Sequence, residues 1–429
     1  MKTRIVMSLP FQLATAGLVA WILAGLMGAT PNIEHSSWFV LLMVLKTTYI
    51  GLLKMVVGLV VLFSLLQGIS GIGSMVRFRS LGMKTIAFYT LTSVLAIALG
   101  LGVSLALPPW PPMPDITSVT LAPGVQLIDG SSAPLASIVT KLVDLATVNP
   151  VKALAETNLL AIVTFSVFLG LSLLAAVPSN HPVFSVIEGV NKALNQLVGS
   201  IVKFSPVAVF AIVFDFSIAG GNRIWSELAT FALVVFVLTA VHGLVVLPGI
   251  AKLATGISFK KLFRAIASPM AMAFATSSSS ATLPLSLQVA EQNLGISQPT
   301  RSMVLPLGAI MNMDGTALFE GVAAIFLAQL YGVDLGTTGL VMIFIMAMVS
   351  SLGAPGMPSG SMSGMQLVLL AAGIPFEAIA ILLIIERPLD TFRTAVNVEG
   401  DLIAALVVDR WTQPTDSRLK PVHYPSVRQ

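Results

Sequence analysis

Polar and charged side chains are concentrated in one segment of an otherwise apolar chain, ERPLDTFRTAVNVEGD, which runs from Glu386 to Asp401. Ionisable groups inside a membrane cost about 3 kcal/mol each, so they usually mark a pathway or a binding site. Here five polar residues are spaced as i, i+3, i+4, i+7 and i+11, which is one stripe of an α-helix. Such a stripe can bind both ends of a charged small molecule and a metal ion. Its members are Asp390, Arg393, Thr394, Asn397 and Asp401.

Arg393 is the candidate ligand for a carboxylate, because its guanidinium stays charged and presents a planar fork of donors. The alternative is a salt bridge to Asp390, one helical turn away, without any ligand.

A run of four serines, Ser277–Ser280, interrupts another apolar stretch in ATSSSSATLP. Serines in membrane helices often only permit close packing. The functional interpretation is a hairpin tip whose hydroxyls and free backbone N–H groups face an anion, since a helix N-terminus has unpaired amides and a positive dipole end.

The motif NMDGT at 312–316 places Asp314 beside Gly315 within an apolar segment and predicts an unwound turn. Exposed carbonyls beside a carboxylate would form an oxygen-only site that suits Na⁺ rather than a soft metal. The alternative is a buried aspartate paired with a lysine or arginine, although none is near in sequence. Asp314, Asp390 and Asp401 against Arg393 leave an excess of negative charge that bound Na⁺ would neutralise.

Glu320 lies six residues beyond Asp314. It is either a structural acid that is hydrogen-bonded to its neighbours or a proton carrier, because burial favours the protonated form of a carboxyl group. Both interpretations stay open.

The elements that position these residues are membrane helices. Apolar residues make up 56% of the 429 residues and charged residues 10%, and several stretches reach the roughly 20 residues that a span requires. The clearest predicted spans are 8–28, 39–67, 86–108, 157–178, 197–217 and 228–251. The first lacks a small-residue cleavage site, so no cleavable signal peptide is expected. The chain has no cysteine, which excludes disulfides and thiol chemistry.

The charge distribution predicts the orientation in the membrane. The formal net charge is +4, and basic residues follow the second and sixth spans and close the chain, whereas the loop at 109–150 is acidic. The positive-inside rule then places both termini in the cytoplasm. We interpret the basic residues as determinants of topology and lipid contact rather than of nucleic-acid binding.

Small and polar clusters break the apolar segments in the second half of the chain. Irregular backbone is tolerated at membrane depth only where protein or a water-filled cavity satisfies it. We therefore expect re-entrant helical hairpins at 258–292 and 337–372, with tips at Ser277–Ser280 and Gly353–Ser361. Two broken segments in corresponding positions suggest inverted repeats with a binding site near the midplane.

Taken together, these motifs resemble the dicarboxylate/amino acid:cation symporter family, the glutamate and aspartate transporters. The resemblance covers most of the chain and is strongest over 270–405. It is carried by SSSSATLP, LPLGAIMNMDGTALFEG, GAPGMPSG and LDTFRTAVNVEGD, with YTLTS at 89–93.

The resemblance implies an all-α integral membrane fold of eight transmembrane helices and two re-entrant hairpins, assembled as a homotrimer whose transport domain moves past a static scaffold. The implied division is 1–70 (scaffold helices 1 and 2), 71–130 (transport helix 3 and outer loop), 131–218 (scaffold helices 4 and 5), 219–257 (transport helix 6), 258–292 (hairpin 1), 293–336 (broken helix 7), 337–372 (hairpin 2, the gate), 373–412 (helix 8) and 413–429 (cytoplasmic tail).

The resemblance also implies residue roles. Asp390 would bind the substrate ammonium and Arg393 its side-chain carboxylate. The rest of the implied substrate site is Ser278, Ser279, Ser280, Thr316, Gly356, Met357, Ser359, Thr394 and Asn397. One implied Na⁺ site comprises Gly308, Asn312, Asn397 and Asp401, a second the backbone of Ile310, Ser351, Leu352 and Ala354, and a third Tyr89, Thr92, Ser93, Asn312 and Asp314. Glu320 matches a glutamate in proton-carrying animal members, where an archaeal member without proton coupling has glutamine.

The chain departs from the family pattern at several positions. Ser277 and Thr391 stand where many relatives have an arginine, and Arg387 is one turn from the site. Pro388 is unusual in its helix, and Gly58 follows KMVV where a proline is common. Hairpin glycines are partly replaced by Ser359 and Ser361. These changes bear on gating and substrate preference, not on the class of function.

We expect a symporter, not an enzyme, which takes up L-aspartate, L-glutamate or both with Na⁺, either alone or together with H⁺, across a bacterial-type inner membrane, without an organic cofactor. Asp390 argues against a plain C4-dicarboxylate and Arg393 against a neutral amino acid. An intramembrane serine hydrolase that uses the Ser277–Ser280 cluster would need a base, and we expect His242 to have no acidic partner nearby and to be a core residue. The histidines His35, His181, His242 and His423 lack zinc-like spacing. An ion channel is a third alternative, because paired re-entrant hairpins resemble pore loops.

Overall fold

The computed structural model describes residues 9–27, 36–71, 78–113, 140, 143–220, 223–353, 361–374 and 378–412, and these are helical without any strand. The α-helices are α2 (Leu9–Met27), α3 (Ser37–Ser70), α5 (Met83–Ala106), α7 (Pro150–Ala155), α8 (Leu159–Ala176), α9 (Pro182–Val202), α10 (Ser205–Gly220), α11 (Arg223–Val241), α12 (Leu247–Thr255), α13 (Phe259–Thr276), α14 (Ser279–Gln292), α15 (Gln298–Met311), α16 (Asp314–Leu330), α17 (Gly336–Gly353), α18 (Ser361–Ala371) and α19 (Ile379–Thr412). Two π-helical turns, η2 (Phe78–Gly82) and η4 (His242–Val246), precede α5 and α12.

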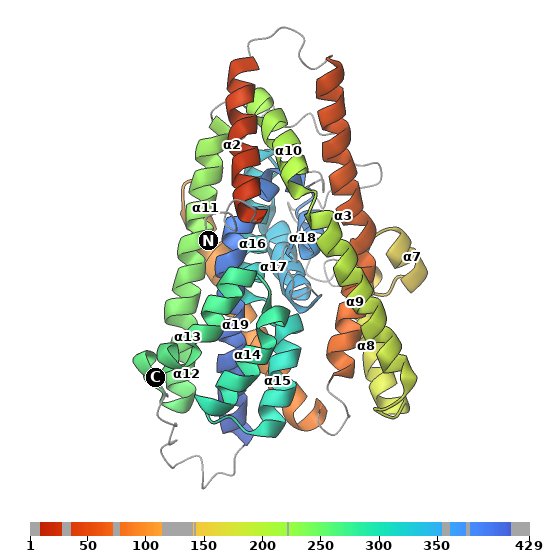
Figure 1. The fold of residues 1–429 in the computed structure, drawn as a ribbon, viewed down its shortest axis with the longest axis vertical. Helices are drawn as coiled ribbons and strands as arrows, with labels where there is room; N and C mark the ends of the chain where they lie inside the picture. Colours follow the sequence, from red (N-terminus) through yellow and green to blue (C-terminus); the bar gives the residue numbers. More distant parts are fainter. Residues whose placement is uncertain are drawn as a thin grey trace.

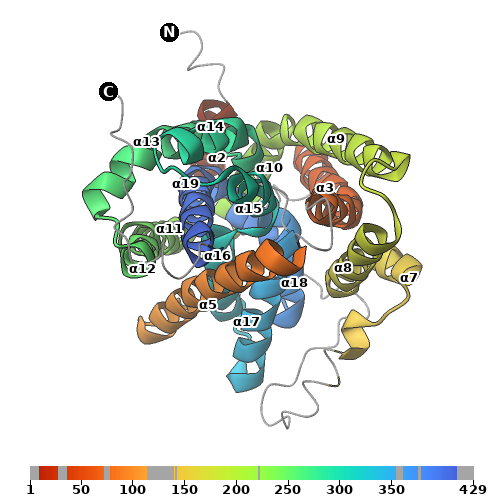
Figure 2. The same ribbon diagram turned by 90° about the horizontal axis from the view of Figure 1, so that it is seen from below.

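The helices form two groups that differ in their contacts. In Figures 1 and 2, α3, α8 and α9 lie together on one side of the molecule, and α10 joins them through contacts with α3 and α2. The other group surrounds α19, which packs against α5 and α11–α16, and it includes α17 and α18, which pack against α16. The two groups meet where α10 and α2 contact α19, and where α3 contacts α15, α17 and α18.

The helices α16 and α19 form the centre of the second group. Nearly every residue of α16 is buried, as is most of α19 from Leu389 to Asp409. A helix that is buried on all sides must be apolar nearly all round, and α16 satisfies this with alanine, leucine, phenylalanine and glycine. Most polar side chains of α16, and of α19 between Leu389 and Asp409, are therefore held inside the protein.

Five segments of the described chain are long and apolar enough to cross a bilayer: Ser37–Ser70, Met83–Ala106, Leu159–Ala176, Arg223–Thr255 and Gln298–Leu330. They become six if α9 and α10, which are bent by 48°, are taken as one span. The apolar helix at Phe11–Met27 is shorter, and α19 carries many charges. The prediction of eight spans is not settled by these helices.

The predicted span 197–217 is wrong as one continuous helix, because α9 ends at Val202 and α10 begins at Ser205. Pro206 lies at the second position of α10, where its missing N–H costs no helical hydrogen bond. The other predicted spans correspond to helices within a few residues at each end, except that the predicted span 228–251 includes the π-helical turn η4.

Helical hairpins occupy both predicted positions. The first is formed by α13 and α14, which meet at Ser277 and Ser278, and the second by α17 and α18, which contact each other. The predicted second tip includes residues 354–360, which lie outside the described residues. Whether the hairpins are re-entrant stays a prediction.

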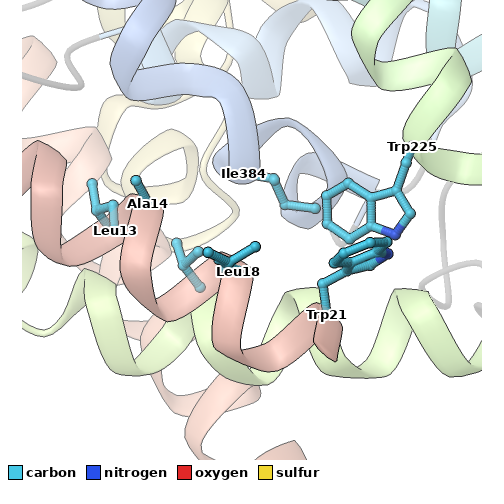
Figure 3. Close-up of a pocket in the computed structure, with 8 residues that line it drawn as sticks. Leu13, Ala14, Leu18, Trp21, Trp225 and Ile384 are labelled. Carbon is cyan, nitrogen blue, oxygen red and sulfur yellow. The ribbon is translucent and has the colours of Figure 1, made fainter. Parts of the chain in front are cut away.

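An apolar cavity of about 370 Å³ lies between α2, α10, α11 and α19 (Figure 3). Its lining includes Trp21, Trp225 and Ile384, and no charged side chain. A charged ligand finds no partner there, so this cavity is distinct from the site that the sequence predicts.

Candidate functional site

The predicted unwound turn between α15 and α16 is present, at Asn312 and Met313, and it is bound to α19. The Asn397 side-chain oxygen accepts the backbone N–H of Gly315 at 2.8 Å, and Asn312 Nδ2 donates to the backbone carbonyl of Asn397 at 3.1 Å. Side chains thus replace helical hydrogen bonds that the break removes, as buried backbone requires. The motif NMDGT and the polar stripe of α19 therefore form one site.

Oxygen atoms gather around Gly308 on α15. Asn312 Nδ2 donates to Asp401 Oδ1 at 2.9 Å, and a Cβ on Gly308 would lie 2.4 Å from both Asp401 Oδ1 and Tyr89 Oη. The Asn312 side-chain oxygen is buried and has no hydrogen-bond partner among the described residues. Carboxylate, amide and carbonyl oxygens are the ligands of hard cations. The residues predicted for the first Na⁺ site thus converge on one buried place.

Asp314 has two side-chain partners. Ser93 Oγ donates to its Oδ1 at 2.7 Å, and His242 Nε2 lies 3.2 Å from its Oδ2. In the same part of α5, the Thr92 hydroxyl donates to the carbonyl of Tyr89 at 3.2 Å. The structure thus brings Ser93 of α5 to Asp314 of α16, and the third Na⁺ site itself stays a prediction.

The expectation that His242 has no acidic partner was wrong. His242 is fully buried and begins the π-helical turn η4, and the fold brings it to Asp314 although 72 residues separate the two. Sequence proximity could not reveal this pair, but a π-helical turn inside a helix often marks a functional position. The alternative in which Asp314 pairs with a lysine or arginine is therefore wrong among the described residues, because its basic neighbour is His242.

The residues of the predicted second Na⁺ site lie on two helices that contact each other, Ile310 on α15 and Ser351 and Leu352 on α17. Ser351 is buried, and its hydroxyl donates to the carbonyl of Met348 at 2.8 Å. Ala354 lies outside the described residues, so this site stays a prediction.

Arg393 is fully buried and is held by two carboxylates on its own helix. Its Nη2 donates to Glu386 Oε1 at 3.1 Å and to Asp390 Oδ1 at 3.2 Å. Its guanidinium lies 4.0 Å above the ring of Phe319, which fixes the plane of the fork. Its Nε and Nη1 have no hydrogen-bond partner among the described residues. Donors that are buried and unpaired are costly, so they indicate where a ligand binds.

Glu386 is the partner that sequence reasoning missed. It lies four residues before Asp390 and so extends the polar stripe by one turn, which was a readable signal. Arg387 is also near, with its Nη1 3.9 Å from Asp390 Oδ2. Glu386 and Arg387 add one charge of each sign, so the expected excess of negative charge near Asp314 and Asp401 is unchanged.

The serine run forms the junction of the first hairpin. Ser277 ends α13 in the left-handed region with φ of 50°, and Ser278 caps α14 by accepting the N–H of Ala281 at 3.2 Å. Ser278 and Ser279 are buried, whereas Ser280 is exposed. The helix α14 packs against α19, the helix that carries the polar stripe.

The remaining predicted substrate residues are partly described. Thr316 on α16 and Thr394 on α19 are buried, and the Thr394 hydroxyl donates to the carbonyl of Asp390 at 2.7 Å. The predicted ligands Gly356, Met357 and Ser359 lie outside the described residues.

Glu320 is fully buried, and its carboxyl oxygens make no hydrogen bond among the described residues. A Cβ on Gly364 of α18 would lie 2.6 Å from Glu320 Oε1 and even closer to the Ser350 hydroxyl of α17. The carboxyl group therefore lies against both arms of the second hairpin. The interpretations of Glu320 as a proton carrier and as a structural acid both stay open.

Glu399 is a second buried carboxyl group that the sequence analysis did not single out. It is nine residues from Asp390, which places it on the opposite face of α19. Its side chain packs against Gly243 of η4, and its oxygens make no hydrogen bond among the described residues. Its position off the stripe explains why periodicity did not reveal it.

Comparison with known proteins decides the family. The sodium:dicarboxylate symporter family matches residues 13–411. The chain belongs to this family. Its members are symporters rather than enzymes, and with the apolar helices described above this makes the protein a multi-pass membrane transporter. The family resemblance inferred from the motifs is thereby confirmed.

Three relatives within the family show its range. The chain is 30% identical to the proton/glutamate-aspartate symporter of Escherichia coli, over 96% of this chain and 95% of the relative. It is 31% identical to a proton/sodium-glutamate symport protein of Geobacillus stearothermophilus, over 85% and 86%. It is also 32% identical to the neutral amino acid transporter B(0) of Oryctolagus cuniculus, over 86% and 73%. The family thus includes carriers of acidic and of neutral amino acids.

Proposed function

We propose that this chain is a secondary active symporter that takes up an acidic amino acid, L-aspartate or L-glutamate, together with Na⁺. The observation that carries the proposal is Arg393, which is buried with two free donors beside Asp390. A guanidinium selects a carboxylate, and Asp390 supplies the charge that an ammonium group requires. Two of the relatives named above are glutamate symporters.

The coupling ions would bind where Asp314 and Asp401 are buried. Unpaired negative charge is expensive inside a protein, and the oxygen-rich surroundings of Gly308 and Asn312 suit Na⁺. Cation binding would lower the cost of bringing a further anion into the site. Two to three such cations would accompany each substrate, in the positions predicted from the sequence.

We propose an elevator-type mechanism in a homotrimer, as the family resemblance implies; the two groups of helices support its division of the chain into a moving part and a static part. The group around α19 carries the proposed ligands, whereas α2, α3 and α8–α10 carry none of them and would be the scaffold. Lys46 of α3 forms an ion pair with Asp215 of α10 at 2.5 Å, which ties two scaffold helices together. The second hairpin would close over the substrate, in a plasma membrane with both termini cytoplasmic.

The test is Na⁺-dependent uptake of radiolabelled L-aspartate and L-glutamate into liposomes that contain the purified chain. The proposal expects uptake that requires Na⁺ outside and saturates with substrate. Succinate and serine should compete weakly. Ion flux without substrate would indicate a channel, and an absence of acidic amino acid uptake would contradict the proposal.

A neutral amino acid is the second candidate substrate, because the chain is as similar to the neutral amino acid transporter B(0) as to the glutamate symporters. Arg393 argues against it, since a neutral side chain would leave the free donors of Arg393 unpaired. The same uptake assay with alanine and serine decides between the two.

Glu320→Gln should preserve Na⁺-dependent aspartate binding and abolish the dependence of uptake on a proton gradient. Glutamine keeps the size of the side chain but cannot carry a proton. The measurement is uptake into proteoliposomes with the interior alkaline, which should stimulate the wild type if protons enter with the substrate. Glu156→Gln, which removes an exposed carboxylate at the C-cap of α7, is the control. A wild type that is indifferent to the gradient would make Glu320 a structural acid.

A further inference from the structure

Three buried side chains on two helices form a continuous chain of hydrogen bonds that ends on the substrate arginine. Ser361, the first residue of α18, donates through its hydroxyl to Glu386 Oε1 at 3.2 Å. The same oxygen accepts Arg393 Nη2 at 3.1 Å. All three residues are at most 3% exposed. Glu386 therefore connects an arm of the second hairpin to the residue proposed to bind the substrate carboxylate.

The pairing of Arg393 conflicts with the role proposed for Asp390. Asp390 and Glu386 both accept from Arg393 Nη2. Asp390 Oδ2 also lies 3.9 Å from Arg387 Nη1. An ammonium group that binds Asp390 competes with Arg393 for this carboxylate and weakens their bond. A bidentate carboxylate on Arg393 also needs an Nη2 hydrogen together with Nε or Nη1, because only adjacent nitrogens form the fork. One of the two bonds at Nη2 must therefore open when substrate binds.

From this geometry we infer that Glu386 is a positioning residue that determines the preference for an amino acid over a plain dicarboxylate, an inference that rests on the proposed function. Glu386 stays on Nη2 as the permanent counter-ion of Arg393. Asp390 is thereby free to turn to the ammonium group, and the hydrogen it leaves joins the free donors in binding the carboxylate. Glu320 is a nearby acid on α16, but it makes no hydrogen bond to Arg393 that could replace Glu386.

Ser361 sets the position of Glu386. A glycine at this position could not donate this bond. Because Ser361 begins α18, the orientation of Glu386, and through it that of Arg393, depends on where this arm of the second hairpin lies.

Glu386→Gln tests the inference, because it keeps the shape and an acceptor but removes the charge. Asp390 would then be the only carboxylate bonded to Arg393, and releasing it to an ammonium group would cost more. The dissociation constant for L-aspartate should rise by about 10-fold or more. Succinate has no ammonium group, so its carboxylate can take the Nη2 hydrogen that the neutral glutamine holds only weakly, and Asp390 keeps its bond to Arg393. Its inhibition constant should stay unchanged or fall, since Arg393 has lost a competing anion.

The measurement is binding of both ligands to the purified full-length chain at saturating Na⁺, with the Na⁺ affinity measured separately. Glu188→Gln, on the exposed face of α9, is the matched control. Ser361→Ala should weaken aspartate binding by roughly 2- to 5-fold and add nothing in the Glu386→Gln background, because both act through one oxygen. Ser226→Ala, which removes an exposed serine hydroxyl, is its control.

Several outcomes would overturn the inference. Equal losses for aspartate and succinate, or a fall in Na⁺ affinity as well, would show that Glu386 only maintains the fold. An unchanged aspartate affinity in Glu386→Gln, with a wild type that binds aspartate, would remove Glu386 from substrate selection. Additive effects of the two substitutions would show that Ser361 does not act through Glu386. A wild type that binds no acidic amino acid would overturn the proposed function and this inference together.

Discussion

Arg393→Ala should weaken L-aspartate binding by at least about 3 kcal/mol, which is more than about 100-fold in the dissociation constant. The substitution removes the donors that would bind the substrate carboxylate. It also leaves Glu386 and Asp390 without their shared cation at Nη2, and stranded buried charge adds to the loss. Neutral amino acids such as serine should then compete better, because the remaining site no longer requires an anionic side chain. Calorimetric or fluorescence titration of the purified variant in Na⁺ measures both effects.

Two further variants separate recognition from folding in this experiment. Arg393→Lys keeps the positive charge between Glu386 and Asp390 but lacks the planar fork, so it should fold and still lose most of the aspartate affinity. Arg301→Ala removes an arginine that pairs with Glu291 away from the site, and it should bind normally. Unchanged aspartate affinity in a folded Arg393→Ala variant would remove this residue from the site.

The features of the site that follow from helical periodicity were predictable. Residues at i, i+3, i+4, i+7 and i+11 share one face of a helix whatever surrounds it, so Asp390, Arg393, Asn397 and Asp401 could be grouped without any structure. The break at Asn312 was predictable for a similar reason, because a polar turn with Asp-Gly inside an apolar segment cannot be an ordinary membrane helix. Both signals depend on neighbours in sequence, and the structure retains both.

The features that depend on packing between distant segments were not predictable. The contact of His242 with Asp314 and the contact of Ser361 with Glu386 join helices whose relative rotation and height are set by the whole fold. The bend between α9 and α10 was missed because the sequence is apolar on both sides of Lys203 and Phe204. The single charge of Lys203 did not indicate a break. Glu399 was missed because a residue on the opposite face of α19 has no periodic partner in the stripe.

Asp401→Asn should weaken Na⁺ binding and, through it, substrate binding. Asp401 accepts from Asn312 and faces the place that a Cβ on Gly308 would fill, beside the Tyr89 hydroxyl. A unit charge a few ångströms from a cation is worth about 4 kcal/mol even at an effective dielectric constant of about 20. The asparagine retains an oxygen ligand and recovers part of this, so a loss of roughly 10- to 100-fold in Na⁺ affinity is expected.

Thermodynamic linkage gives this prediction its sharpest test. If Na⁺ and substrate bind cooperatively, a weaker Na⁺ site must lower the substrate affinity at low Na⁺, and raising Na⁺ must restore much of it. Aspartate titrations of wild type and Asp401→Asn across a series of Na⁺ concentrations should therefore give curves that converge at high Na⁺. Asp334→Asn, which changes an exposed aspartate before α17, should follow the wild type throughout.

A loss of aspartate affinity that is equal at every Na⁺ concentration would place Asp401 outside the cation site. A wild type whose aspartate affinity ignores Na⁺ altogether would make proton coupling, with Glu320 as its carrier, the better account of these buried acids.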